Sequence, residues 1–211
     1  MNDLNPRTPI PSSVDDLNFE SLSWGQVYDL LLNLAEDILK SEFRPDIIVG
    51  VSRGGWIPAR ILSDLLETPK LANVTAEFYV GINETIHEPA ITQPLSLPVM
   101  GRKVLIVDDL VDTGKSLNLV NLHLENQGAS EVRIATIYFK PWSITIPDYF
   151  EKETRNWIVF PWELKETVKK TVETFKTEGR TLEEVKKKLI GSGIDRKLTE
   201  HLIKKIVSDE D

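Results

Sequence analysis

The stretch Val104-Leu-Ile-Val-Asp108-Asp109-Leu-Val-Asp112-Thr113-Gly114-Lys115-Ser116 decides the fold of this chain. Its first four residues are apolar and three of them are β-branched, which is typical of a strand buried on both faces of a parallel sheet. Two acids, Asp108 and Asp109, follow directly at the carboxyl end of this strand, where open α/β sheets bind their ligands. Residues 112–116 predict a tight turn that opens a helix over residues 116–127. The stretch therefore predicts an α/β fold with a parallel-centred sheet flanked by helices.

The residues after this strand provide two kinds of binding group. Backbone N–H groups in a glycine-containing turn at a helix N-terminus cradle a phosphate, and the hydroxyls of Thr113 and Ser116 add donors. The neighbouring acids Asp108 and Asp109 suit sugar hydroxyls or Mg²⁺, which prefers oxygen ligands. A phosphate site beside a site for a diol and a metal describes a ribose 5-phosphate. Gly114-Lys115-Ser116 also matches the end of a P-loop, but that motif requires a glycine where this chain has Asp109.

The stretch resembles the signature of the type I phosphoribosyltransferases. The resemblance implies that Thr113, Gly114, Lys115 and Ser116 hold the 5-phosphate of phosphoribosyl pyrophosphate (PRPP). It also implies that Asp108 and Asp109 hold the ribose hydroxyls, with Asp109 as the contact for the cofactor Mg²⁺. Asp112, in the same PRPP-binding loop, is expected near N7 of a purine as the general acid/base.

A second strand and turn, earlier in the chain, predict a further anion site. Residues 47–51 are apolar and run into Ser52-Arg53-Gly54-Gly55, followed by a helix that begins at Trp56 or Pro58. The glycines let backbone N–H groups approach an anion, and Arg53 supplies positive charge. In the family resembled, Ser52, Arg53, Gly54 and Gly55 form the pyrophosphate loop of the branch that acts on 6-oxopurines. The resemblance also implies a non-proline cis peptide at or beside Arg53.

Two later segments predict a site for the base. A strand over residues 131–139 closes at Lys140, and residues 157–162 predict a last strand that begins with Trp157 and Ile158. This arrangement resembles bacterial xanthine-guanine and archaeal 6-oxopurine phosphoribosyltransferases. The resemblance implies that Lys140 binds the purine O6, that Trp157 stacks on the ring, and that the backbone of Ile158 reads the purine edge. The alternative for Trp157 is an anchor in the core.

The segment between the two anion sites predicts a strand and a long loop. Residues 76–81 alternate as a strand, whereas residues 82–98 contain three prolines and show no helical or strand pattern. A loop of this length is usually functional, and the resemblance implies a flap that closes over PRPP. His87 lies within it, either as a solvated side chain or as a catalytic one.

Three regions are expected along the chain. Residues 1–22 predict an irregular arm, residues 23–165 the phosphoribosyltransferase domain with a small hood holding Lys140 and Trp157, and residues 166–211 a helical C-terminal extension. Ser23 with Gln26, and Thr181 with Glu184, form capping boxes that predict helix starts. Further helices are expected over residues 164–176, 181–190 and 195–207.

Charge and hydropathy limit the classes of partner. The formal net charge is −8, which disfavours general attraction to nucleic acid or to an anionic membrane. From residue 163 onward, 12 Lys and Arg residues are interspersed with 11 Asp and Glu residues, a pattern typical of solvated helix faces. No signal peptide and no apolar run of about 20 residues is visible, so we expect a cytoplasmic protein that binds no nucleic acid and no membrane.

The resemblance predicts a purine salvage enzyme. It would transfer the 5-phosphoribosyl group of PRPP to hypoxanthine, guanine or xanthine, and would release pyrophosphate and the purine nucleoside 5′-monophosphate. A homo-oligomer, dimer or tetramer, is expected. The alternatives are transfer to adenine or orotate, or a non-catalytic regulator that binds PRPP. Adenine carries an amino donor where Lys140 also offers a donor, which would leave buried polar groups without acceptors.

Overall fold

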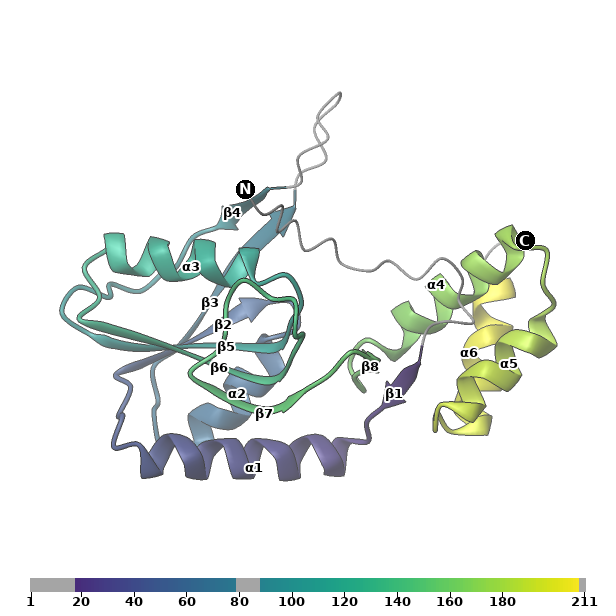
Figure 1. Ribbon diagram of the computed structural model, residues 1–211, viewed down its shortest axis with the longest axis horizontal. Helices are drawn as coiled ribbons and strands as arrows, with labels where there is room; N and C mark the ends of the chain where they lie inside the picture. Colours follow the sequence, from purple (N-terminus) through teal and green to yellow (C-terminus); the bar gives the residue numbers. More distant parts are fainter. Residues whose placement is uncertain (1–17, 79–87, 209–211) are drawn as a thin grey trace, which may run out of the picture. The chain divides into compact units, whose positions relative to one another are not determined.

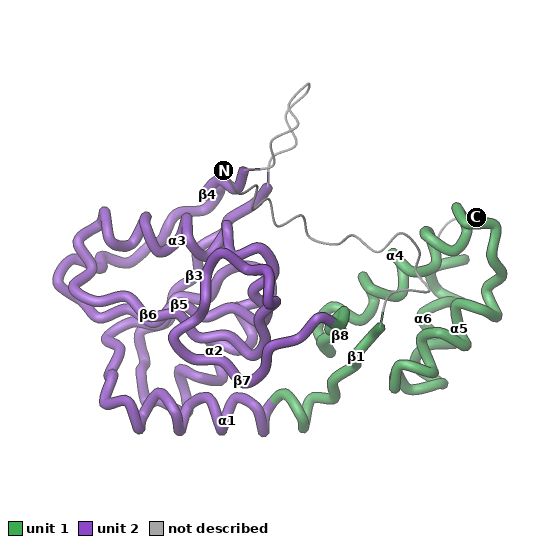
Figure 2. The backbone as a smooth tube through the Cα atoms, viewed as in Figure 1, with its two compact units in different colours: residues 1–27, 156–211 green, residues 28–155 purple. Residues whose placement is uncertain are grey.

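The computed structural model describes residues 18–78 and 88–208 of the 211-residue chain. The chain divides into two compact units, which are residues 28–155 and residues 1–27 together with 156–211 (Figure 2). The expected domain boundaries, after residues 22 and 165, stay a prediction.

A six-stranded sheet in the order β4-β3-β2-β5-β6-β7 forms the centre of the larger unit (Figure 1). Its strands are β2 (Ile47–Ser52), β3 (Leu71–Phe78), β4 (Pro89–Gln93), β5 (Lys103–Val111), β6 (Glu131–Phe139) and β7 (Tyr149–Glu153). All neighbouring pairs are parallel except β3 with β4, which is antiparallel. The parallel-centred sheet expected from the sequence is therefore confirmed.

Helices cover both faces of this sheet. Helix α3 (Lys115–Asn126) lies on one face, and α1 (Trp24–Lys40) and α2 (Trp56–Leu65) lie on the other (Figure 1). Side chains alternate along β5 between these faces. Val104 and Ile106 belong to the buried cluster that also contains Leu117, Val120 and Leu124 of α3. The apolar run in β5 is thus explained by burial on both sides.

The central strand β5 continues beyond the acids. It was expected to end before Asp108, but it stays paired with β6 as far as Val111 and Phe139. In contrast, β2 pairs with β5 only as far as Gly50 and Val107. The two strands separate at this point, so Asp108 and Asp109 lie where β5 has lost one of its neighbours.

Two edge strands were not expected. Strand β4 falls within residues 82–98, which were predicted to have no strand, and its first residue is Pro89. Proline is tolerated at the first position of an edge strand because no ladder donor is needed there. Strand β7 ends in the polar run Glu151-Lys-Glu153 and pairs with β6. The predicted flap residues 79–87, with His87, lie outside the described residues.

The smaller unit contains a two-stranded parallel sheet and three helices. Strand β1 (Phe19–Ser21) pairs with β8 (Trp157–Val159), so the prediction of an irregular arm is wrong for residues 19–21. The helices are α4 (Leu164–Thr177), α5 (Leu182–Gly191) and α6 (Arg196–Ser208). Their apolar faces form one buried cluster with Val159 of β8. The helical extension expected from the sequence is confirmed.

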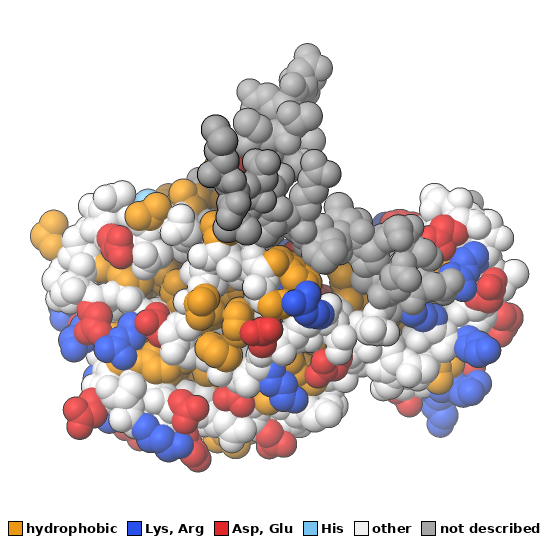
Figure 3. Space-filling view, in the orientation of Figure 1, with side chains coloured by type: hydrophobic (Ala, Val, Ile, Leu, Met, Phe, Trp, Pro, Cys, Tyr) orange, Lys and Arg blue, Asp and Glu red, His pale blue; other side chains and the backbone are white. Residues whose placement is uncertain are grey.

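Both capping boxes are formed as the sequence predicts. The Thr181 N–H donates to Glu184 Oε2 at 2.8 Å, and the Glu184 N–H donates back to Thr181 Oγ1 at 3.4 Å. At the start of α1, the Ser23 N–H donates to Gln26 Oε1 at 2.9 Å. Acidic and basic side chains are interspersed on the visible face (Figure 3). Within residues 18–78 and 88–208, no helix combines the length and the apolar character needed to cross a membrane.

Candidate active site

A pocket of about 180 Å³ lies at the carboxyl end of β5. Its lining residues come from the ends of β3 and β5 and from the start of α3: Phe78, Asp108, Leu110, Val111, Asp112, Thr113, Gly114, Ser116 and Leu117. Five of the expected PRPP-binding residues are therefore brought together. Pockets that hold a whole small ligand are usually larger, about 300–1,000 Å³, so this one fits a phosphate and part of a sugar.

The turn at the bottom of the pocket depends on Gly114. It caps α3 in the left-handed conformation with φ of 79°, and no side chain makes a capping hydrogen bond there. A Cβ atom on Gly114 would lie 2.5 Å from Ser143 Oγ and 2.7 Å from the Thr145 nitrogen. Only glycine satisfies both the dihedral angle and this close approach. Helix α3 therefore begins at a glycine that has no capping side chain, and a helix N-terminus of this kind suits a bound anion.

Lys115 points away from the expected phosphate. Its Nζ lies 2.8 Å from Glu88 Oε1, just before β4, and Lys115 does not line the pocket. Its backbone N–H faces Thr113 Oγ1 at 3.4 Å. The main chain of Lys115 therefore belongs to the turn, whereas its ammonium group is engaged with an acid at the sheet edge.

The two acids at the end of β5 are poorly solvated. Asp109 is 8% exposed, and its Oδ1 accepts the Leu110 N–H at 2.8 Å. Asp108 Oδ1 accepts the Asp109 N–H at 3.0 Å. Burial, and then the neighbouring charge of Asp109, raise the pKa of Asp108 well above its usual range. A bound cation or a set of hydroxyl donors would stabilise both carboxylates.

The donor set fits a magnesium ion that is shared with a phosphorylated ligand. In the described part of the chain, no three His, Asp, Glu or Cys side chains are grouped as a protein-only metal site. Asp108 and Asp109 could supply two carboxylate ligands. Mg²⁺ is commonly held by one or two carboxylates together with substrate oxygens and water, so this pair would be sufficient if a bound phosphorylated ligand supplied the rest.

The turn after β2 packs directly against this acid pair. The Ser52–Arg53 peptide is cis, as the resemblance implies. A Cβ atom on Gly54 would fall 2.3 Å from Asp109 Oδ2, and one on Gly55 would fall 2.2 Å from the Val107 carbonyl oxygen. Both glycines are required by this close approach, which places the two anion sites predicted from separate segments beside each other.

The loop after β6 lies against the turn of residues 113–116, called the phosphate turn below after the ligand expected from the sequence. Lys140 is 6% exposed, and its N–H donates to the Val111 carbonyl at 2.8 Å. Two residues later, Trp142 Nε1–H donates to Asp112 Oδ1 at 2.9 Å. Trp142 and the pocket-lining Phe78 were not identified from the sequence. The one available signal for Trp142 was an aromatic residue two positions after the strand-ending lysine.

Trp157 and Ile158 belong to β8 in the smaller unit, whereas Lys140 belongs to the larger one. Trp157 is 46% exposed and Ile158 is buried. The alternative of Trp157 as a core anchor is therefore wrong. The joint role of Lys140, Trp157 and Ile158 at one purine stays a prediction.

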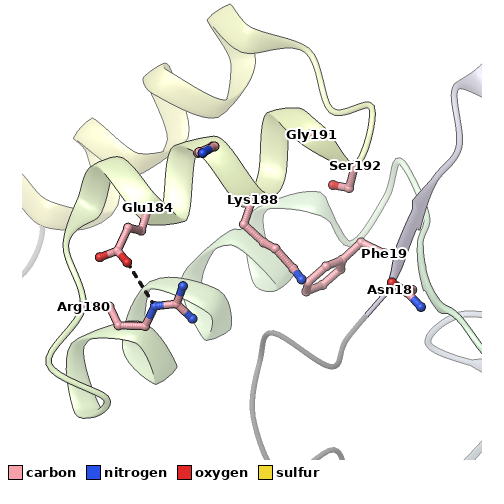
Figure 4. Close-up of a pocket in the computed structure, with 8 residues that line it drawn as sticks. Asn18, Phe19, Arg180, Glu184, Lys188, Gly191 and Ser192 are labelled. Carbon is pink, nitrogen blue, oxygen red and sulfur yellow. Dashed lines mark ion pairs between the residues drawn. The ribbon is translucent and has the colours of Figure 1, made fainter.

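A second pocket, of about 480 Å³, lies in the smaller unit (Figure 4). Two of its basic side chains contact groups of the protein itself. Arg180 Nε lies 3.5 Å from Glu184 Oε1, and Lys188 Nζ lies 5.9 Å from the centre of the Phe19 ring. None of the expected PRPP-binding or purine-binding residues lines this pocket. The candidate active site is therefore the pocket at the end of β5.

Comparisons with known proteins agree with this placement. Residues 22–168 match the family model described as phosphoribosyl transferase domain. The xanthine-guanine phosphoribosyltransferase of Gluconobacter oxydans is 30% identical over 149 residues, which cover 70% of this chain and 86% of that protein. Xanthine phosphoribosyltransferase 1 of Saccharomyces cerevisiae is 27% identical, with 72% of this chain and 92% of that protein covered.

A solved purine phosphoribosyltransferase structure is similar to this chain in both sequence and fold. The crystal structure of a purine phosphoribosyltransferase from Pyrococcus horikoshii Ot3 is 40% identical to this chain. It superimposes with a TM-score of 0.63 over 69% of this chain and 94% of that chain. The family match covers the segment that carries the acid pair and both glycine turns. The chain therefore belongs to the phosphoribosyltransferase family.

Proposed function

We propose that the protein transfers the 5-phosphoribosyl group of PRPP to a 6-oxopurine, with release of pyrophosphate. The observation that carries this proposal is the meeting of three features at the end of β5. These features are the Asp108–Asp109 pair, the Gly114 turn at the start of α3, and the Gly54–Gly55 turn packed on Asp109. Together they match the sugar, the 5-phosphate and the pyrophosphate of one PRPP molecule.

PRPP would bind with its 5-phosphate on the main-chain N–H groups of residues 113–116. Thr113 and Ser116 line this pocket and add hydroxyl donors. Asp108 and Asp109 would hold the ribose hydroxyls and, through Asp109, Mg²⁺. When bound, Mg²⁺ would neutralise charge on the departing pyrophosphate. The loop of Ser52, Arg53, Gly54 and Gly55 would hold that pyrophosphate.

The chemistry then depends on position and charge more than on covalent help from the protein. The bond between the anomeric carbon and the pyrophosphate oxygen breaks, and the purine N9 forms the new bond to that carbon. A proton on the purine N7 passes to Asp112. The exposed Asp112 lies at the mouth of the pocket, beside the residues that would hold the sugar.

The choice of base is proposed to depend on Lys140. Lys140 is buried and carries an ammonium donor, which the O6 of hypoxanthine, guanine or xanthine would accept, whereas the 6-amino group of adenine is itself a donor. Trp157 would stack on the ring and the backbone of Ile158 would read its edge. The names of the Gluconobacter and yeast relatives favour xanthine and guanine among the bases.

The remaining predictions are also proposals. They are a homo-oligomer, dimer or tetramer, a cytoplasmic location, and no nucleic-acid or membrane partner. A regulator that binds PRPP and nucleic acid would need a basic surface. The net charge of −8 and the mixed charges of the visible face favour the enzyme (Figure 3).

The test is pyrophosphate release from PRPP and Mg²⁺, with hypoxanthine, guanine, xanthine, adenine and orotate offered separately. We expect turnover with at least one 6-oxopurine and none above background with adenine or orotate. Turnover with adenine alone would contradict the role of Lys140. PRPP binding with no turnover on any base would contradict the enzyme and favour the regulator.

A further inference from the structure

Asp112, the proposed general acid/base, is held by a side chain that the proposed reaction has not used so far. Trp142 Nε1–H donates to Asp112 Oδ1 at 2.9 Å. Among residues 18–78 and 88–208, this is the one hydrogen bond that the Asp112 side chain makes. An exposed carboxylate without such a donor rotates freely about its side-chain bonds. The indole therefore fixes one of the two carboxylate oxygens.

The loop that carries Trp142 is itself anchored to the phosphate turn. The Ile144 N–H donates to the Thr113 carbonyl at 3.0 Å, and Thr145 Oγ1 donates to the Gly114 carbonyl at 3.0 Å. At the other end of the loop, the Lys140 N–H donates to the Val111 carbonyl at 2.8 Å. The indole is thus carried on main chain that is bound on both sides of Asp112.

The face of the indole ring is also occupied. Lys140 Nζ lies 5.5 Å from its centre and the Arg155 guanidinium carbon lies 6.0 Å from it. Both distances are within the range of cation–π attraction, about 6 Å. Two cations on the ring and a carboxylate on its N–H oppose rotation of the side chain. The ring therefore connects the proposed O6-binding lysine to the proposed proton acceptor.

We propose that Trp142 is a positioning residue for Asp112, and that its indole N–H holds Oδ1 so that Oδ2 receives the proton from the purine N7. This inference rests on the proposed function. In this proposal the indole acts through Asp112 and takes no direct part in the bond changes. Its effect should fall on turnover, because the position of the proton acceptor matters in the transition state more than in the complex with PRPP.

The test is a double-mutant cycle of Trp142→Phe and Asp112→Asn, assayed with PRPP and the best 6-oxopurine. Phenylalanine removes the N–H donor and keeps a ring for Lys140 and Arg155. We expect kcat to fall on the order of tenfold, as for loss of one hydrogen bond to a charged group. The KM for PRPP should stay within about twofold of the wild-type value. Trp24→Phe, at an exposed indole in the smaller unit, is the matched control and should leave kcat unchanged.

The cycle separates action through Asp112 from a general effect of the ring. If Trp142 acts through Asp112, Trp142→Phe should have almost no effect on kcat in the Asp112→Asn background. A full tenfold loss in that background, or wild-type kcat in the single variant, would overturn the proposal. An active wild-type enzyme with an unaffected Trp142→Phe variant would contradict this inference alone. A wild-type protein that transfers to no base would contradict the proposed function, and the role of Trp142 with it.

A spectroscopic measurement gives a readout that does not depend on turnover. In ¹⁵N-labelled protein, the indole N–H resonance lost in Trp142→Phe identifies Trp142. That resonance should move when Asp112 is replaced by Asn, because a neutral amide is a weaker acceptor than a carboxylate. The Trp24 resonance should stay in place. An unmoved Trp142 resonance would overturn the contact on which the proposal depends.

Discussion

Replacement of Gly114 by alanine tests the phosphate turn most sharply. The residue has φ of 79°, and an added Cβ would lie 2.5 Å from Ser143 Oγ and 2.7 Å from the Thr145 nitrogen. Gly101→Ala is the matched control, because Gly101 has nearly the same φ, 70°, but nothing within 4 Å of the added atom. The pair separates strain of the backbone from displacement of the neighbouring loop.

The structure allows an order-of-magnitude expectation for each variant. An alanine in the left-handed region costs about 1–2 kcal/mol at either position. At Gly114, the loop after β6 that carries Ser143 and Thr145 must also move. This movement disturbs two 3.0 Å hydrogen bonds, from Thr145 Oγ1 to the Gly114 carbonyl and from the Ile144 N–H to the Thr113 carbonyl. Each bond contributes about 1 kcal/mol. We therefore expect Gly114→Ala to lower the free energy of unfolding by about 3–4 kcal/mol and Gly101→Ala by about 1–2 kcal/mol.

Urea unfolding gives the two free energies, and titration calorimetry with PRPP and Mg²⁺ gives the two dissociation constants. Movement of the turn should weaken PRPP binding about tenfold or more in Gly114→Ala, since about 1.4 kcal/mol corresponds to a factor of ten. Gly101→Ala should bind PRPP as the wild type does. Equal losses of stability together with unchanged PRPP binding in both variants would refute the argument that loop packing makes glycine necessary at residue 114.

Three further predictions concern the acids, the lysine and the helical extension. Asp108→Asn should raise the unfolding midpoint of the ligand-free protein at pH 7, because it removes a half-buried charge beside the charge of Asp109. It should also lower kcat/KM at least about 100-fold, because Asp108 is proposed to hold the sugar hydroxyls. Since the folded-state pKa of Asp108 lies above its unfolded value of 3.8, its contribution to stability falls as pH rises from that value through the folded pKa. Thermal melts of the wild type at several pH values should therefore show a melting temperature that falls with pH, and Asp108→Asn should show a shallower fall. Equal slopes in the two proteins would contradict the raised pKa of Asp108. Lys140→Met should lower kcat/KM for hypoxanthine by about 100-fold, measured by pyrophosphate release, because O6 loses a charged donor. If the variant loses more affinity for PRPP than it loses kcat/KM for hypoxanthine, Lys140 lies outside the base site. Thr181→Ala should lower the melting temperature by about 2–4 °C through loss of the capping box and leave kcat unchanged, whereas a large fall in kcat would show that α5 takes part in the reaction. The hydrogen bonds from Thr181 lower the pKa of Glu184, so the contribution of Glu184 to stability should be lost as pH falls below its unfolded value of 4.5.

Local patterns in the sequence were sufficient for the core of the site. The apolar run before Asp108, the glycine turn at Gly114 and the turn at Gly54 each occupy fewer than ten consecutive residues, and each has the structure that its composition predicts. Both capping boxes form for the same reason, since donor and acceptor are three residues apart. Signals of this kind need no knowledge of the rest of the fold.

Pairings between distant segments could not be predicted in the same way. Strand β1 pairs with β8 across more than a hundred residues, and its three residues carry no periodic pattern. The edge strands β4 and β7 are polar or begin with proline, so hydrophobic alternation does not reveal them. The length of β5 was underestimated because an acid pair normally marks the end of a buried strand, whereas β6 alone continues to pair with it up to Val111.

The residues missed at the site share one property. Trp142 reaches Asp112 across 30 residues of sequence, and Phe78 lines the pocket from the end of a different strand. An aromatic residue in a loop or at the end of a strand has no local feature that distinguishes a functional contact from a solvated surface. These two residues can be identified as part of the site only from the fold, which brings β3, β5 and the loop after β6 to one edge of the sheet.

The central claim, transfer from PRPP to a 6-oxopurine, is tested most directly by competition in a single reaction. Equal concentrations of hypoxanthine, guanine, xanthine and adenine would be mixed with limiting PRPP and Mg²⁺, and the product nucleotides separated and quantified by mass. We predict the 5′-monophosphates of the 6-oxopurines in at least about 100-fold total excess over adenosine 5′-monophosphate, because the 6-amino group of adenine offers Lys140 no acceptor. Adenosine 5′-monophosphate in equal or greater amount, or no nucleotide at all, would contradict the account.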